Sequence, residues 1–425
     1  MHVAFVAPPL AGHLNPTLAL AAELISRGCE ATYFGYSDTA SKVAAAGVGF
    51  ADLGPAPAGF SLAERQAMLS GAGSPLTMRR IIAMMAADTR ALLDRLPDAF
   101  REHAVAAVVS DQLEPAGALV AQHIRVPYAS LANALLINRD PIAPPYFTGW
   151  PPRSSKLARQ MIQGAEQTYD WITSAHGRAI EDAVTRLGLT PQKTASDCLS
   201  DRLDLIQIPE AFDLPREAPA PQLAYVGPIR PAAAERGEER ADPKIVADIV
   251  DGRSPDRPLV FASFGTLFGD RFRSFRTLAE AAKRSGLDIV IADGGRLSEQ
   301  QRGRLRELGA HVESFVPQRA ILGHAAVCVT HGGMNTTMDA MTAEVPVMAL
   351  PVAFDQMANG ARIRHAGVGV VRSHMTLTVA QACRDLQALI NDAEKKRAVS
   401  RMAHAIAESG GRAQAADLVM RRLAD

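Results

Sequence analysis

The sequence is short of cysteine and has no apolar segment long enough to cross a membrane. Its four cysteines, Cys29, Cys198, Cys328 and Cys383, stand far apart and form no C-x-x-C pair. This spacing argues against a disulfide framework or a zinc site and is typical of a reducing compartment. No apolar run reaches the roughly 20 residues of a transmembrane helix, and "MHVAFVAPPLAGHL" lacks the basic start and long apolar centre of a signal peptide. We therefore expect a cytoplasmic protein.

The chain also lacks net charge, since 45 basic residues balance 45 acidic ones. No overall field favours nucleic acid as a partner. What the chain does have is length and apolar content. Its 425 residues, 48% of them hydrophobic, are enough for two or three domains with sizeable cores.

The first half predicts a parallel α/β sheet. "HVAFVA" (2–7) is a buried strand, and the helical spacing after it places Asn15 as N-cap, Pro16 at the first helical position and Gly28 at the end. Residues 105–124 repeat the order of strand, polar turn and helix. Strands that alternate with helices favour a parallel sheet covered on both faces.

A second half of the same kind follows a polar stretch. Residues 137–156 predict a loop rich in proline and aromatics, and the charged segment after "VGPIR" predicts a linker. We expect one domain over 1–228, a linker over 229–257, a second domain over 258–407 and a last helix, about 408–425, that packs back on the first domain. Two doubly wound domains place a ligand cleft between them, at the carboxyl ends of their strands.

Two polar side chains follow strands of the first predicted domain. His13 stands in the loop after the first strand, where it could act as a general base, because its pKa lies near working pH. Asp111 ends another strand, where it could fix the tautomer of His13 and stabilise the imidazolium. The alternatives are a histidine that only caps the helix and an aspartate that only makes a turn.

Two motifs of the second predicted domain favour a nucleotide. The small residues Ser263, Gly265 and Thr266 follow its first strand and would let a ligand approach the backbone. They could equally be an ordinary turn. Phe315 ends another strand and could stack on a planar base, while the backbone of Val316 reads its edge. The alternative is a core phenylalanine before a proline.

The most informative motif is "THGGMNTTMDAM" (330–341), a turn between a buried strand and a helix. Free backbone N–H groups and the positive end of the helix dipole make an anion site at such a turn. It is not a P-loop, because the lysine of G-x-x-x-x-G-K-S/T is missing. His331, Asn335 and Thr336 can add hydrogen bonds, and Asp339 could accept from ribose hydroxyls. The alternative is a glycine-rich turn with no ligand.

A last pair, Asp355 and Gln356, follows the strand "VPVMALP". Adjacent carboxylate and amide groups suit the vicinal hydroxyls of a sugar, although an aspartate that caps a helix would look the same. All five motifs fall at strand ends that face one cleft, so together they favour a nucleotide-sugar site over five separate turns.

In this order, the motifs resemble the nucleotide-sugar signature of the UDP-glycosyltransferases, the family 1 group with the GT-B fold. The quoted segments are "FVPQ", "HGGMNTT" and "FDQ", and the resemblance extends to the N-terminal "GHLNP" and over essentially the whole chain. "SDQLEPAGALVA" and "THGGMNTTMDAM" are similar to the bacterial branch that glucosylates carotenoids such as zeaxanthin. The resemblance implies two Rossmann-like domains that face a central cleft.

The resemblance also implies roles for single residues. His13 would be the general base and Asp111 its partner, and Phe315 stands where many members stack a tryptophan on uracil. The implied donor contacts are Gln318 and Asp339 for the ribose, Ser263, His331, Gly333, Asn335 and Thr336 for the pyrophosphate, and Asp355 and Gln356 for the sugar. Most relatives have glutamate in place of Asp339, and glutamine at the position of Gln356 favours glucose.

The implied reaction is a single displacement with inversion, from UDP-glucose to an acceptor hydroxyl. UDP-glucose is a co-substrate, no cofactor is expected, and the absence of a D-x-D triplet predicts no metal requirement. Segments 59–93 and 130–147, rich in methionine and leucine, predict an adaptable apolar pocket for a lipophilic acceptor, with ordinary core packing as the alternative. A carotenoid acceptor would bring the enzyme to a bilayer.

Three other functions are open on the sequence alone. One is transfer to another natural product, such as a macrolide or a flavonoid. Another is epimerisation of a nucleotide sugar, which would need no acceptor pocket. The third is a binding protein that keeps the fold without catalysis, against which the presence of both His13 and Asp111 argues.

Overall fold

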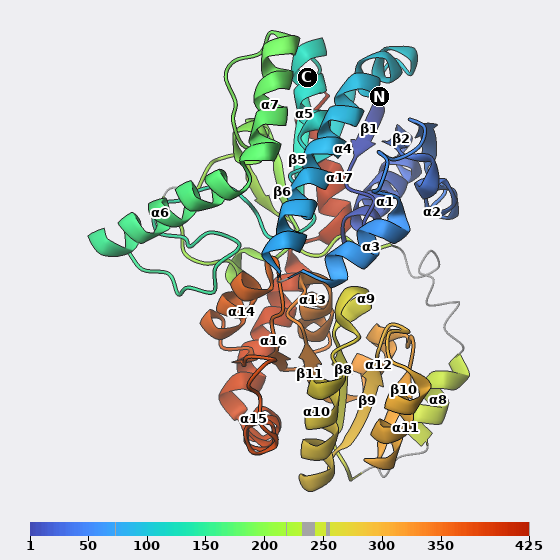
Figure 1. Cartoon of the computed structure of the whole chain (residues 1–425), viewed down its shortest axis with the longest axis vertical. Coiled ribbons are helices and arrows are strands. Elements are labelled where there is room, and N and C mark those ends of the chain that lie inside the picture. The colour runs from blue at the N-terminus through green and yellow to red at the C-terminus, as the bar shows by residue number, and fades with distance from the viewer. Residues whose placement is uncertain (73, 218, 232–242, 252–255, 425) are drawn as a thin grey trace.

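The computed structural model describes residues 1–72, 74–217, 219–231, 243–251 and 256–424, and its two parallel sheets stand one above the other in Figure 1. The first sheet has seven strands in the order β3-β2-β1-β4-β5-β6-β7, and the second has six in the order β10-β9-β8-β11-β12-β13. All pairings are parallel. The predicted class, α/β with two doubly wound sheets, is confirmed.

The strands of the first sheet are β1 (His2–Val6), β2 (Glu30–Gly35), β3 (Gly49–Asp52), β4 (Ala107–Asp111), β5 (Tyr128–Ala132), β6 (Asp204–Ile206) and β7 (Leu223–Tyr225). The helices in this half are α1 (Ala11–Ser26), α2 (Ala40–Ala45), α3 (Leu62–Ser70), α4 (Pro75–Glu102), α5 (Ala116–Ile124), α6 (Lys156–Ile172) and α7 (Ser174–Leu187), with short 3-10 turns η1 (Ser37–Thr39), η2 (Ala195–Cys198) and η3 (Glu210–Phe212).

The strands of the second sheet are β8 (Leu259–Ser263), β9 (Asp288–Ala292), β10 (Ala310–Glu313), β11 (Ala325–Thr330), β12 (Val347–Ala349) and β13 (Gly369–Val371). The helices after β7 are α8 (Pro243–Asp251), α9 (Gly265–Phe268), α10 (Phe272–Arg284), α11 (Glu299–Glu307), α12 (Gln318–Leu322), α13 (Met334–Thr342), α14 (Gln356–His365), α15 (Val379–Asn391), α16 (Ala393–Glu408) and α17 (Gly411–Arg422).

Strand β1 shows how each sheet buries both of its faces. Val3 and Phe5 join a core cluster with side chains of α1 and α17, whereas Ala4 and Val6 join another with side chains of α4, α5 and α7. Successive side chains of a strand point to opposite faces, so an uninterrupted apolar strand needs helices on both sides. The last helix, α17, thus packs beside α1 near the start of the chain (Figure 1).

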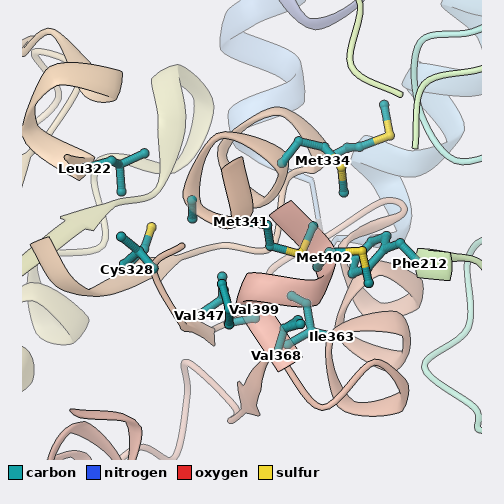
Figure 2. Packing of buried hydrophobic residues seen from close by; sticks show 14 of the residues in the cluster. Phe212, Leu322, Cys328, Met334, Met341, Val347, Ile363, Val368, Val399 and Met402 are labelled. Carbon is teal, nitrogen blue, oxygen red and sulfur yellow. The ribbon is translucent and has the colours of Figure 1, made fainter. Parts of the chain in front are cut away.

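The core beneath the second sheet also takes in a side chain from the first half (Figure 2). Met341 of α13 and Met402 of α16 pack with Val347 of β12, and Phe212 of η3, which lies between β6 and β7 of the first sheet, is beside Met402. Burying these apolar side chains together therefore stabilises the contact between the two halves as well as the second sheet.

A buried ion pair crosses between the halves as well. The Nε and Nη2 atoms of Arg362 on α14 donate to Oδ1 of Asp213 over 3.0 and 2.6 Å. Oδ2 of the same carboxylate accepts from Nε of Arg216 at 2.9 Å and from the Tyr225 hydroxyl at 2.7 Å. Burial would raise the pKa of Asp213, but the charges of Arg362 and Arg216 hold it below its ordinary value. We call these four residues the Asp213 clamp.

One local prediction needs correction, and another falls largely outside the described residues. Helix α1 begins at Ala11, because the backbone N–H of Leu14 already bonds to the carbonyl of Leu10 over 2.7 Å. Asn15 is therefore not the N-cap, and Pro16 lies inside the helix, where its ring removes one backbone bond early in the helix. The predicted linker, 229–257, contains helix α8, and the rest of that linker falls largely on 232–242 and 252–255, which lie outside the described residues.

In each sheet, the order in which successive strands are added reverses at one pair of adjacent strands. In the first sheet β1 lies beside β4, and in the second β8 lies beside β11, although neither pair is consecutive in the chain. Loops that leave such strands turn to opposite sides and open a crevice at their carboxyl ends. Asp111 and Ser263 are the last residues of β4 and β8, and His13 and His331 lie in the segments that follow β1 and β11.

Candidate active site

His13 and Asp111 form a hydrogen-bonded pair at the first of these crevices. His13 lies in the first turn of α1, not in the loop that the sequence predicted, and its Nδ1 is 2.7 Å from Oδ2 of Asp111. Asp111 ends β4 with its side chain fully buried, and its Oδ1 accepts from the backbone N–H of Leu113 at 2.8 Å. A carboxylate only accepts, so Nδ1 carries the proton and Nε2 is left as the basic nitrogen.

The surroundings favour the protonated form of His13. Burial alone would lower its pKa, but the charge and hydrogen bond of Asp111, together with the charge of Asp355, raise the pKa above its ordinary value. Asp355 belongs to the second half, so both halves act on this imidazole. Such an environment stabilises an imidazolium, the form that a general base takes once it has accepted a proton.

A chain of buried side chains that the sequence prediction missed holds Asp111 in place. Nδ2 of Asn133 donates to Oδ2 of Asp111 at 2.7 Å and to the hydroxyl of Thr17 at 2.8 Å. Nε2 of Gln207 donates to Oδ1 of Asn133 at 2.6 Å. Asn133 directly follows β5 and Gln207 directly follows β6. The same strand-end position that singled out Asp111 could therefore have found both.

At the second crevice, the turns after β8 and β11 meet around the imidazole of His331. Gly265, with φ of 66°, comes so close that an added Cβ would lie 3.1 Å from Cε1 of His331, and a Cβ on Gly333 would overlap the same ring. Only glycine leaves room for the ring at both places. Burial lowers the pKa of His331 to about 4, so this residue is neutral at pH 7 and contributes hydrogen bonds without a charge.

The predicted ribose and pyrophosphate side chains form one cluster with an arginine that the sequence prediction did not include. Gln318 donates from Nε2 to Oδ2 of Asp339 at 2.8 Å, and the Thr336 hydroxyl donates to Oε1 of Gln318 at 3.3 Å. Arg230 donates from Nε to Oδ1 of Asp339 at 3.1 Å and from Nη1 to Oδ1 of Asn335 at 3.0 Å. The motif "VGPIR" was visible in the sequence, but it gave no sign of the contact across the cleft.

The other predicted donor residues lie around this cluster. Phe315 follows β10 with 63% of its surface exposed, so its ring is open for stacking, and it is not the core side chain of the alternative. The neighbouring Val316 is half-buried. Ser263 is buried at the end of β8 and its hydroxyl oxygen accepts from the N–H of Gly265 at 3.3 Å, while Thr266 is exposed on α9.

Both members of the predicted sugar-binding pair have partners in the protein, and those of Asp355 are the longer contacts. Asp355 stands at the N-cap position of α14 without a side-chain capping bond, and its Oδ2 accepts from the N–H of Leu135 at 3.4 Å across the cleft. Gln356 is buried, and its Oε1 accepts from the N–H groups of Val352 and Ala353 at 2.8 and 3.0 Å. A sugar hydroxyl could therefore bind to Nε2 of Gln356, whereas at Oε1 it would compete with the two backbone N–H groups.

A cavity of about 510 Å³ opens beside the first crevice. Its wall combines apolar and aromatic side chains with many charged ones: Met85, Leu113, Leu136, Tyr146, Phe147 and Tyr169 on one hand, and Arg139, Glu166, Asp170, Arg178, Lys193 and Asp197 on the other. Leu113, whose backbone N–H bonds to Asp111, is one of its lining residues. Both segments that predicted an acceptor pocket contribute to it. Met68 and Met84, from the first of these segments, are instead buried in a core cluster, as the alternative of core packing described.

Comparison with known proteins identifies the class of enzyme. Residues 77–407 match the model of the family described as UDP-glucoronosyl and UDP-glucosyl transferase. The solved structure of the glycotransferase of kitacinnamycin superposes with a TM-score of 0.78 over 99% of both chains, at 21% identity. The chain belongs to this transferase family, and its two sheets form the GT-B fold.

Two zeaxanthin glucosyltransferases match nearly the whole chain. A zeaxanthin glucosyltransferase of Pantoea ananas is 33% identical over 421 residues, which cover 98% of this chain and 95% of that enzyme. Another zeaxanthin glucosyltransferase, of Pseudescherichia vulneris, is 33% identical over 427 residues, which cover 100% of this chain and 98% of that enzyme. The chain is therefore a glycosyltransferase, which binds a nucleotide sugar and an acceptor.

Proposed function

We propose that this glycosyltransferase moves glucose from UDP-glucose to a hydroxyl of a lipophilic small molecule, a carotenoid such as zeaxanthin. The observation that carries the proposal is the hydrogen-bonded pair of His13 and Asp111, with Nδ1 and Oδ2 2.7 Å apart at the first crevice, where the charge of Asp355 from the second half also acts on His13. The names of the 33% identical relatives support the acceptor class, and the apolar part of the cavity wall offers such an acceptor a surface.

The pair supplies the chemistry at the acceptor. Nε2 of His13 takes the proton of the acceptor hydroxyl as that oxygen attacks the anomeric carbon of the sugar. The bond from that carbon to the diphosphate breaks, and its electrons leave with UDP. Attack from the face opposite the leaving group inverts the configuration, so an α-linked donor yields a β-glucoside. Asp111 stabilises the imidazolium that results.

The turn after β11 and the residues around it would bind the UDP part of the donor. Gly333 is the N-cap of α13, whose first-turn N–H groups and positive dipole end suit a diphosphate. Phe315 would stack on uracil, and Gln318 and Asp339 would meet the ribose. Asp355, whose carboxylate interacts electrostatically with His13, would hold sugar hydroxyls. Stabilisation of the leaving diphosphate by protein dipoles lets the transfer proceed without a metal.

An acceptor screen tests the proposal most directly. The purified chain is incubated with UDP-glucose and, separately, with zeaxanthin, a macrolide aglycone and a flavonoid, and the products are read by mass spectrometry. We expect a hexosylated zeaxanthin. Transfer only to the macrolide or to small polar phenols would refute the carotenoid and leave a different natural-product glycosyltransferase. Epimerised or hydrolysed UDP-glucose without any transfer would refute the reaction itself.

Helix α6 suggests how such an acceptor is reached. It extends away from the rest of the molecule in Figure 1 and exposes Leu157, Met161 and Trp171 to 67%, 50% and 77%. At 3.6 residues per turn these three share one face, while Glu166 and Tyr169 on the other side line the cavity. The described part of the chain contains no helix long and apolar enough to span a bilayer. We propose that this face, which we call the α6 face, rests on a lipid surface.

Vesicle sedimentation tests this contact. The exposed Lys156 at the start of α6 favours anionic lipid, so the chain should sediment with phosphatidylglycerol vesicles. Leu157→Glu with Met161→Glu should abolish sedimentation. Leu76→Glu is the matched control, because Leu76 is 69% exposed on α4 instead. Equal sedimentation of all three proteins would contradict the role of the α6 face.

A further inference from the structure

Arg230 reaches from the first half of the chain into the predicted donor site. It follows β7 and stands after "VGPI", yet its guanidinium makes three hydrogen bonds to α13 of the second half. Besides the bonds to Asp339 and to the Asn335 side chain, Nη2 donates to the backbone carbonyl of Asn335 at 3.2 Å. The arginine therefore lies against the side chains that are expected to hold ribose and diphosphate.

The backbone of Arg230 is fixed while its side chain spans the cleft. The N–H of the preceding Ile229 donates to Oε1 of Gln207 at 3.2 Å, and Gln207 belongs to the buried chain that ends at Asp111. Ile229 itself is fully buried in the core of the first sheet. The side chain of Arg230 is 19% exposed. A fixed backbone with a long, partly exposed side chain allows the guanidinium to change partners without a change of fold.

The charge of Arg230 suits the predicted diphosphate site. A nucleoside diphosphate brings two or more negative charges, whereas the helix N-terminus supplies only about half a positive charge and the predicted pyrophosphate ligand His331 is neutral at pH 7. Arg230 is a full cation hydrogen-bonded to the first turns of α13. In the structure its charge is balanced by Asp339, over 3.1 Å. The planar guanidinium matches the bidentate geometry of phosphate oxygens.

We propose that Arg230 binds the diphosphate of the donor and that Asp339 holds the guanidinium only while the site is free. This assignment rests on the proposed function. When the donor enters, the diphosphate takes the guanidinium, and the carboxylate of Asp339 accepts the ribose hydroxyls in its place. Gln318 stays on Oδ2 of Asp339 through the exchange. The same cation then faces the charge that develops on departing UDP, so Arg230 contributes to the rate of transfer as well as to binding.

Calorimetric titration with UDP and with uridine separates this role from a merely structural one. Arg230→Gln should weaken UDP binding by about tenfold or more, while uridine binding changes by less than about twofold. Arg230→Lys, which keeps the charge without the fork, should lie between the two. Arg304→Gln, on the exposed face of α11, is the matched control and should bind UDP as the wild type does.

Asp339→Asn provides the reciprocal test. It frees Arg230 and weakens the ribose contact, so the preference for UDP over uridine should widen. Equal losses of UDP and uridine in Arg230→Gln, or an unchanged preference in Asp339→Asn, would overturn the inference and leave Arg230 as a support for Asp339. A wild-type chain that binds neither UDP nor TDP would instead refute the proposed function, and the inference with it.

Discussion

Replacing Asp111 by asparagine should disable His13 while leaving its position nearly unchanged. Oδ2 of Asp111 accepts from both His13 and Asn133, and Oδ1 accepts from the N–H of Leu113. An amide can present its oxygen to only one of these sides. If the oxygen faces Leu113, the amide nitrogen donates to Nδ1, and the proton of His13 moves to Nε2. His13 then has no basic nitrogen left for the acceptor hydroxyl.

The magnitude follows from the charge that is lost. Two unit charges about 4 Å apart attract by about 4 kcal/mol at an effective dielectric constant of about 20. This attraction stabilises the imidazolium, so its loss should lower kcat by about a thousandfold. That figure lies within the roughly 10²–10⁴-fold range of general-base catalysis.

The pH dependence of kcat/KM tests the role of Asp111 independently. The base must be neutral in the free enzyme, so kcat/KM of the wild type should rise with pH through a pKa above the ordinary value for histidine. In Asp111→Asn, burial still lowers the pKa of His13, but the charge of Asp111 no longer raises it. The rising limb of kcat/KM should therefore move to lower pH, even as the plateau falls.

Initial rates of glucoside formation, measured by liquid chromatography from pH 5 to 9, test both statements. Calorimetry with UDP serves as the control, because Asp111 lies on the acceptor side and UDP affinity should stay within about twofold. Unchanged kcat in Asp111→Asn, or a limb that does not move, would refute the role of the pair.

Three further outcomes follow from other parts of the structure. Arg362→Met should lower the free energy of unfolding by about 1–3 kcal/mol in urea titrations at pH 7, because it removes both hydrogen bonds to Oδ1 of the buried Asp213, while Arg216 stays paired with Oδ2. The folded pKa of Asp213 is depressed, so the stability that the Asp213 clamp contributes is present above the ordinary carboxyl pKa and is lost as pH falls through the lower, folded value. Phe315→Ala should weaken UDP binding by about 1–3 kcal/mol, the value of one stacked base, with an unchanged melting temperature because the ring is exposed. EDTA should leave the rate of transfer unchanged, and a large loss that magnesium restores would contradict a metal-independent site.

The parts of the fold that periodicity controls could be predicted from the sequence. Buried strands such as β4 and β11 are short apolar runs with turn residues on both sides, and a polar residue at a strand end in a doubly wound sheet faces the crevice. Asp111 and His331 were found in this way. The start of α1 was missed, because a proline is favoured at the first helical position and yet is tolerated several residues into a helix that begins with Ala11.

Contacts between distant segments left no local pattern. The bond from Arg230 to Asp339 joins residues that are 109 positions apart, and the bond from Arg362 to Asp213 spans 149 positions. The burial of Oε1 of Gln356 in its own loop depends on how that loop closes, which residue types do not reveal. Sequence patterns thus located the strand ends, while the partners that restrain each side chain came from loop closure and from packing within and between the two halves.

The rate of hexose transfer from UDP-glucose to zeaxanthin by the wild type and by His13→Ala, with UDP affinity measured on the same samples, tests the proposed function most directly. Hexosylated zeaxanthin should form with the wild type and not with His13→Ala, while both bind UDP equally well. Transfer by His13→Ala at the wild-type rate would contradict the assigned base, and no transfer by the wild type would contradict the assigned reaction.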